Sequence, residues 1–159
     1  MIRFIVGMIA AGACCAVFAG AAQAAHDAGR DVFAARCAVC HQAGGRGMDG
    51  LAPPLTTYPA RYAALAEGRA QLVQTVLDGM FGDVTVDGKH YNFRMPSFAA
   101  LSDTEIADVL NHVVFDLAAK PPGRVAPISA SDVRAQRARP LDGAQVRERR
   151  AALLRMLGP

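Results

Sequence analysis

Apolar residues recur at intervals of three and four in two stretches of the sequence, and this spacing predicts two amphipathic helices. The first stretch covers residues 67–79 and ends at Gly79, a residue that often follows the last turn of a helix. The second begins at the capping pattern of residues 102–105 and stops before the proline pair at 121–122. The apolar positions are Leu72, Val73, Val76, Leu77 and Met80 in the first helix, and Ile106, Val109, Leu110, Val113 and Leu117 in the second. Because Met80 continues the spacing of the first stripe, it is interpreted as a core side chain rather than a ligand.

A short β-hairpin is predicted between these two helices. Residues 84–86 and 89–93 have alternating character and flank Asp87-Gly88, a dipeptide that favours a tight hairpin turn. The hairpin would form a small flap that ends just before Met95-Pro96.

Another helix is predicted over residues 27–40, with Asp27 as its candidate cap. Gly29 and Phe33 lie four residues apart and therefore share a face. Such a face would let a second helix approach closely at the glycine and pack against the aromatic ring. Residues 44–54 hold four glycines and end in Pro53-Pro54, which predicts a loop.

The N-terminal residues 1–24 have the form of a secretion signal. A basic start at Arg3 precedes an uncharged run, and Ala22-Gln-Ala24 has the small-x-small pattern of a cleavage site. If it is not cleaved, the run is just long enough to span a bilayer. A lipid anchor at Cys14 is a further alternative, which Ala11 disfavours. We expect export to the periplasm, with membrane attachment only if this segment stays uncleaved or is lipidated.

Charge divides the rest of the chain into two parts. Residues 25–119 carry 7 Lys/Arg and 11 Asp/Glu, whereas residues 120–159 carry 9 Lys/Arg and 3 Asp/Glu. We therefore divide the chain into a domain over 25–119 and a basic C-terminal extension over 120–159, in which two short helices are predicted on either side of Pro140. We interpret the extension as a solvated amphipathic appendage that docks or tethers the protein. It has no interleaved aromatic residues, so nucleic-acid binding is not expected.

The strongest chemical signal is Cys37-Ala-Val-Cys40-His41. On a helix, two thiols and an imidazole at i, i+3 and i+4 share one face. This spacing is the attachment signature for covalently bound haem, in which the thiols join the two vinyl groups and the histidine binds iron. A thiol redox pair or half of a zinc site are the alternatives. The only other cysteines, Cys14 and Cys15, lie in the expected signal. We predict one haem c with iron, held by Cys37, Cys40 and His41. A carbonyl of the 44–54 loop is a candidate partner for the other ring nitrogen of His41, and an ordinary rigid loop is the alternative.

A second iron ligand would come from further along the chain, where the candidates are Met48, Met80, Met95, Met156, His90 and His112. Met95 is favoured, because Pro96 holds it in an extended conformation just ahead of a capped helix. A thioether ligand also raises the reduction potential of haem iron. His90, in the same flap, is the main rival. His112 lies beside an apolar stripe, and we expect it to pack rather than to bind metal.

The order of these motifs resembles that of class I c-type cytochromes. The resemblance covers about residues 26–118 and rests on the haem signature, Ala52-Pro-Pro-Leu55, Met95-Pro-Ser-Phe98 and residues 101–113. It implies an all-α fold in which the first and last helices cross beside the haem, with Gly29 and Phe33 facing Val109 and His112. Members of that family usually place an aromatic residue where His112 stands. The hairpin flap and the C-terminal helical extension depart from the minimal fold.

The expected function is that of a periplasmic mono-haem carrier that passes single electrons between redox partner proteins, such as a dehydrogenase, a reductase or an oxidase. No constellation of catalytic acid, base or nucleophile is evident, so an enzyme is not expected. The alternative is a peroxidase-like haem enzyme with an open or labile sixth position, which ligation by Met95 would exclude. Flaps and tails of this kind are similar to those of cytochromes that serve periplasmic dehydrogenases as partners or subunits.

Overall fold

The computed structural model describes residues 24–158 of the 159-residue chain. The predicted signal segment, residues 1–24, thus lies outside the described residues except for its last position. No helix among residues 24–158 is both long enough and apolar enough to cross a bilayer.

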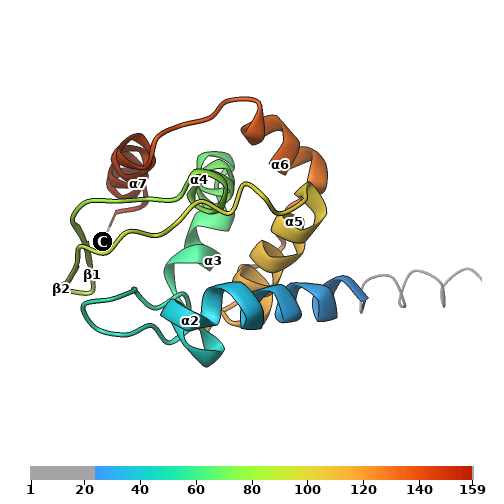
Figure 1. Ribbon diagram of the computed structural model, residues 1–159, viewed down its shortest axis with the longest axis horizontal. Coiled ribbons are helices and arrows are strands. Elements are labelled where there is room, and N and C mark those ends of the chain that lie inside the picture. Colours follow the sequence, from blue (N-terminus) through green and yellow to red (C-terminus); the bar gives the residue numbers. More distant parts are fainter. Residues whose placement is uncertain (1–23, 159) are drawn as a thin grey trace, which may run out of the picture.

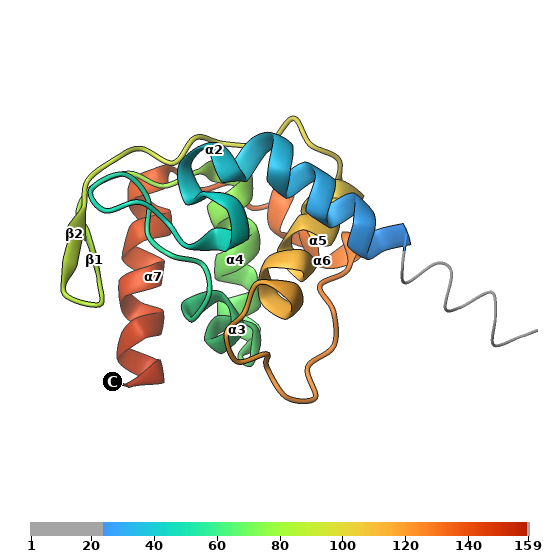
Figure 2. The ribbon, with the colours of Figure 1, turned by 90° about the horizontal axis from the view of Figure 1, so that it is seen from below.

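The protein has an all-α fold with a small hairpin, as predicted (Figures 1 and 2). The first described helix runs from residue 24 through a π-helical segment, Phe33–Cys37, and ends in α2 (Ala38–His41). A 3₁₀ turn at Ala43–Gly45 lies in the predicted loop. The remaining helices are α3 (Tyr58–Ala63), α4 (Ala66–Asp78), α5 (Asp103–Asn111), which continues as a π-helical segment at His112–Asp116, α6 (Ala130–Arg137) and α7 (Gly143–Leu157). Strands β1 (Val84–Val86) and β2 (Lys89–Tyr91) pair antiparallel, with Val84 opposite Tyr91.

Local capping and turn signals account for most element boundaries. The hydroxyl of Ser102 accepts the Glu105 N–H, and the Glu105 carboxylate accepts the Ser102 N–H, so the predicted capping box is present at α5. Gly79 ends α4 with a φ of 75°. The turn residues Asp87 and Gly88 both have positive φ, as a tight hairpin turn of this kind requires.

One predicted boundary was wrong, and one helix was not predicted. The first helix is already formed at residue 24, so Asp27 lies inside it and does not cap it. Helix α3 was not predicted at all. It is six residues long and begins at Tyr58-Pro59 without a side-chain cap, so its sequence carries little signal beyond a proline near its start.

The first helix crosses the helix formed by α5 and its π-helical continuation, as Figure 2 shows. Gly29 makes this crossing possible, since a Cβ atom at this position would overlap the backbone carbonyl of Asp108. Beside it, the rings of Phe33 and His112 lie 5.6 Å apart, and Phe33 packs in a buried cluster with Val109 and Val113. The structure thus confirms the predicted contact pair, and His112 is the packing residue that the sequence indicated.

The C-terminal extension is helical, as predicted, but the prediction of a solvated appendage was wrong. Ile128, Val133 and Leu153 belong to the same buried cluster as Leu77 and Ile106. Val133 and Val146 are fully buried. Helix α6 packs on α4 and α5, and α7 packs on α4. Residues 128–157 therefore complete the hydrophobic core.

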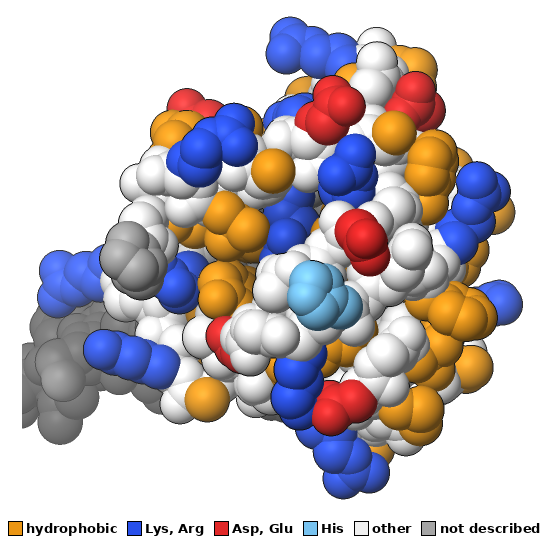
Figure 3. Space-filling model, turned by 90° about the vertical axis from the view of Figure 1, so that its left-hand side faces the viewer, with side chains coloured by type: hydrophobic (Ala, Val, Ile, Leu, Met, Phe, Trp, Pro, Cys, Tyr) orange, Lys and Arg blue, Asp and Glu red, His pale blue; other side chains and the backbone are white. Residues whose placement is uncertain are grey.

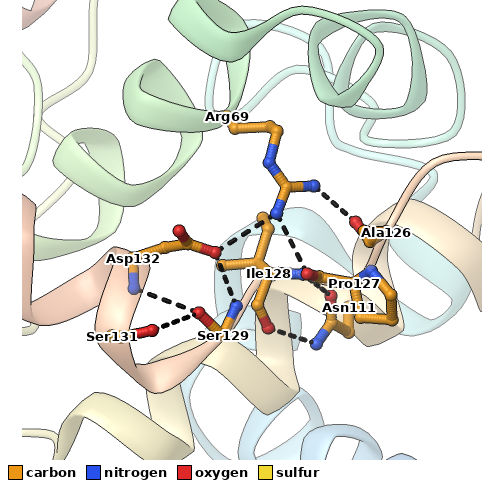
Figure 4. Close-up of polar contacts among 8 residues, drawn as sticks. All are labelled: Arg69, Asn111, Ala126, Pro127, Ile128, Ser129, Ser131 and Asp132. Carbon is orange, nitrogen blue, oxygen red and sulfur yellow. Dashed lines mark hydrogen bonds and ion pairs between the residues drawn. The ribbon is translucent and has the colours of Figure 1, made fainter.

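Polar contacts fasten the start of the extension to the helices beneath it (Figure 4). The Asn111 side chain donates to the carbonyl of Ile128 at 2.9 Å and accepts its N–H at 2.8 Å. The guanidinium of Arg69 donates to the carbonyls of Ala126 and Pro127 and to the carboxylate of Asp132. These bonds satisfy backbone groups in a segment that lacks regular structure, so the chain reaches α6 in a defined position.

Candidate haem site

A cavity of about 440 Å³ lies between α2, the loop that follows it, the 80–98 segment, α4, α5 and α7. This volume is in the range of about 300–1,000 Å³ that is usual for small-molecule and cofactor sites. Its walls are mostly apolar, with Leu51, Pro53, Pro54, Leu55, Leu72, Val76, Val109 and Val113 among the lining residues. Figure 3 shows the face that carries the hairpin, where hydrophobic side chains surround a hollow and basic side chains are set into it.

The end of the first helix brings Cys37, Cys40 and His41 to one wall of this cavity. Both cysteines are free thiols of intermediate exposure, and His41 is 8% exposed. The Nδ1 atom of His41 lies 2.9 Å from the carbonyl oxygen of Pro53. With Nδ1–H as the donor, Nε2 keeps its lone pair for a metal ion. The loop carbonyl expected to orient His41 is therefore that of Pro53.

Burial determines the protonation of this group of residues. It lowers the pKa of His41, and the hydrogen bond to Pro53 opposes only part of this shift. Burial also raises the pKa of the Cys37 thiol to about 11, with a smaller contribution from neighbouring Cys40. At neutral pH the imidazole is thus neutral, as a metal ligand must be, and the Cys37 thiol is protonated.

Met95 also lines the cavity, but it is not alone among the methionines. Met80 lines it too, and the two residues form an isolated antiparallel bridge. The interpretation of Met80 as a core side chain was therefore incomplete, because Met80 packs on the hairpin and also reaches the cavity wall. Residues directly opposite each other in an antiparallel pair place their side chains on the same side.

The other candidate ligands lie elsewhere. Met48 and Met156 are 47% and 63% exposed. His90 is exposed on β2, where it faces Thr85. His112 is buried against Phe33, and its Nδ1 lies 2.8 Å from the Asp116 carboxylate. None of these four lines the cavity that the described residues enclose. Geometry thus reduces the candidates to Met95 and Met80.

Sequence reasoning missed a polar corner of the cavity formed by Tyr62 of α3 and Arg150 of α7. Tyr62 is 5% exposed, and its hydroxyl has no hydrogen-bond partner of good geometry among the described residues. Burial raises the pKa of Tyr62, and the positive charge of Arg150 opposes that rise. One turn earlier on α7, the Nε of Arg147 is buried against Gly82 and likewise lacks a partner within the described part of the chain.

This corner has the donors that a carboxylate requires. The spacing of Arg147 and Arg150 in the sequence places both on one face of a helix, but nothing in it indicates that the face meets Tyr62. Only the packing of α7 against α4 brings Arg150 close to Tyr62. Haem carries two carboxylates at one edge, and Arg150 and Tyr62 would hold them.

The residues therefore fit covalently bound haem. Two thiols would take the two vinyl groups, the Nε2 of His41 and a thioether would take the iron, and the apolar walls would enclose the porphyrin. The buried Tyr62 hydroxyl on the cavity wall, which lacks a partner of good geometry in the described residues, also favours a bound anion, because such groups are costly to leave unsatisfied.

Comparison with known proteins agrees with this geometry. The family model described as Cytochrome c matches residues 26–114. The chain is 41% identical over 120 residues to a protein described as cytochrome c-552 from Thermus thermophilus, and the match covers 75% of this chain and 92% of that relative. A second protein with the same description, from a defined strain of T. thermophilus, is 41% identical over 120 residues, with 81% of that protein covered. The family model ends before α6, so Arg150 lies beyond it.

Proposed function

The chain belongs to the cytochrome c family, so it is an electron carrier with covalently bound haem c, and from this premise we propose that it transfers single electrons between redox proteins of the periplasm. The observation that carries the proposal is the cavity, which His41 and Met95 line from two segments far apart in the sequence. Two iron ligands from the protein would leave no position for a substrate.

Each site residue has a defined task in this proposal. Cys37 and Cys40 attach the haem through thioethers, and His41 binds the iron through Nε2 while Pro53 holds its other nitrogen. Met95 supplies the second ligand, because its segment is extended ahead of α5, whereas Met80 also packs on the hairpin. Bound haem supplies an iron that cycles between Fe(III) and Fe(II). The protein encloses it and raises its reduction potential through the thioether.

The organisation of the chain follows from this role. We propose that residues 1–24 direct export, residues 25–119 form the cytochrome domain, and residues 120–159 form an extension packed on it. The partner is a redox protein such as a dehydrogenase, a reductase or an oxidase. Phe93 and Val39 are exposed beside the cavity and offer an apolar contact surface near the haem.

A pyridine haemochrome spectrum with a redox titration of the periplasmic fraction tests this function. The expected result is one haem c per chain that is reduced and reoxidised reversibly in one-electron steps. Cys37→Ala and Cys40→Ala should each leave at most one thioether, so that part of the haem is lost on acid extraction. Normal covalent haem in both variants, or an absence of haem from the exported wild-type protein, would contradict the proposal.

A further inference from the structure

The segment that carries Met95 is held by a short stretch of chain that follows α4. The Met95 N–H donates to the Met80 carbonyl at 2.9 Å, and the Met80 N–H donates to the Met95 carbonyl at 3.1 Å. One residue earlier, Gly79 allows the two segments to approach, since a Cβ there would lie 2.5 Å from the Met95 carbonyl oxygen. The position of Met95 therefore depends on the position of residues 79–81.

The start of α7 lies directly against residues 80–82. The Phe81 N–H donates to the carbonyl of Gly143 at 3.3 Å. A Cβ atom at Gly143 would lie 2.5 Å from the Phe81 ring and 3.2 Å from the Cα of Met80. Gly143 is itself buried, and the Asp142 carboxylate caps the helix around it by accepting the N–H groups of Ala144 and Gln145. Figure 1 shows α7 beside the segment that runs from α4 to the hairpin and the one that returns from the hairpin to α5.

We propose that Gly143 is a positioning residue for the iron ligand, so that the start of α7 holds Met95 against the haem through Met80 and Phe81. The proposal rests on Met95 being the ligand. It gives the C-terminal extension a task at the haem, although residues 120–159 lie beyond the part that the family model matches. A bulkier side chain at position 143 displaces the Met80 segment, and the backbone pair carries that displacement to Met95.

The test compares the haem-loaded wild type with Gly143→Val, and uses Gly123→Val as the matched control. Gly123 is also in the extension, but a Cβ there meets no atom within 4 Å. Two quantities are measured. The first is the pH at which the ferric protein, titrated toward alkaline pH, loses the weak far-red band of sulfur–iron ligation. The second is the affinity of the ferrous protein for carbon monoxide. Overpacking shifts equilibria by about five- to a hundredfold. We expect Gly143→Val to raise carbon monoxide affinity by a factor in this range and to lose the band at lower pH, while Gly123→Val changes neither.

Two further variants keep the test decisive. If Gly143→Val does not accumulate with haem, Gly143→Ala carries the comparison, because its single methyl group already meets the Phe81 ring. Phe81→Ala removes that ring and should restore much of the wild-type behaviour in the double variant. Wild-type band and carbon monoxide affinity in both Gly143 variants would overturn the proposal. Retention of the band in Met95→Ala would instead overturn the ligand assignment, so the two failures are distinguishable.

Discussion

The Nδ1 atom of His41 and the carbonyl oxygen of Pro53 are 2.9 Å apart, and this bond leaves Nε2 as the nitrogen available to iron. The proline ring restricts the backbone that presents the carbonyl. Glycine at this position would keep the carbonyl but free it to move. We expect Pro53→Gly to weaken binding of His41 to the iron by about tenfold or more, within the range seen when partners of metal ligands are changed. The low-spin spectrum should then be lost at less acidic pH than in the wild type. Pro121→Gly, at an exposed proline, should have no such effect.

The C-terminal extension stabilises the whole molecule through buried side chains. Leu153 of α7 is 3% exposed and lies in the main core cluster, whereas Met156 in the last turn is 63% exposed. Leu153→Ala should lower the free energy of unfolding by about 2–5 kcal/mol, while Met156→Ala should change it by less than about 0.5 kcal/mol. Chemical denaturation followed by circular dichroism and haem absorbance measures both. Separate transitions for the two signals would show that the extension unfolds independently, contrary to the shared core.

Acid should weaken the attachment of α6. Arg137 donates to the Asp103 carboxylate at 2.8 Å, and this bond is the largest cause of a lowered Asp103 pKa. A carboxylate whose pKa is lower in the folded protein stabilises the fold above its unfolded pKa of 3.8, and that stability is lost as pH falls through the folded value. Asp103→Asn should therefore lower stability at neutral pH and flatten its decline below about pH 4. Urea denaturation at several pH values measures this. If stability declined at acid pH in the same way in Asp103→Asn as in the wild type, other carboxylates would account for the pH dependence.

The positive charge of Arg150 should raise the reduction potential. Arg150 lines the cavity beside Tyr62, where it would neutralise a haem carboxylate. Without this charge, the ferric state is favoured and the carboxylate titrates at higher pH. Arg150→Gln should thus lower the potential and move its pH dependence upward, while Arg155→Gln, on the exposed part of α7, should leave both unchanged. Equal effects of the two variants in a redox titration would place the carboxylates elsewhere.

Features that depend on a few neighbouring residues could be predicted from the sequence. The Ser102 capping box, the Asp87-Gly88 turn and the end of α4 at Gly79 each follow from backbone preferences within four residues. The haem signature is similarly local, and so is the face that Gly29 and Phe33 share.

Features that depend on tertiary packing could not be predicted from the sequence. In α7 the buried residues Val146 and Leu153 are seven apart and form a narrow seam between arginines, so the pattern of residues is that of a solvated helix. Several basic side chains of the extension form hydrogen bonds or ion pairs with other parts of the protein. Arg137, for example, binds Asp103 and the carbonyls of Ala99 and Leu101. The proximity of Tyr62 to Arg150, and of Gly143 to Met80, arises only when α7 packs on α4.

The most direct test of a closed, two-ligand iron site is the binding of carbon monoxide to the ferrous protein. The wild type, Met95→Ala, Met80→Ala and His90→Ala are compared at neutral pH by absorbance. A site closed by Met95 predicts that the wild type, Met80→Ala and His90→Ala bind the gas only weakly and slowly, and that Met95→Ala binds it tightly and acquires high-spin character. Rapid binding by the wild type would indicate the open position of a haem enzyme. Tight binding by Met80→Ala or His90→Ala, with Met95→Ala like the wild type, would identify a different ligand.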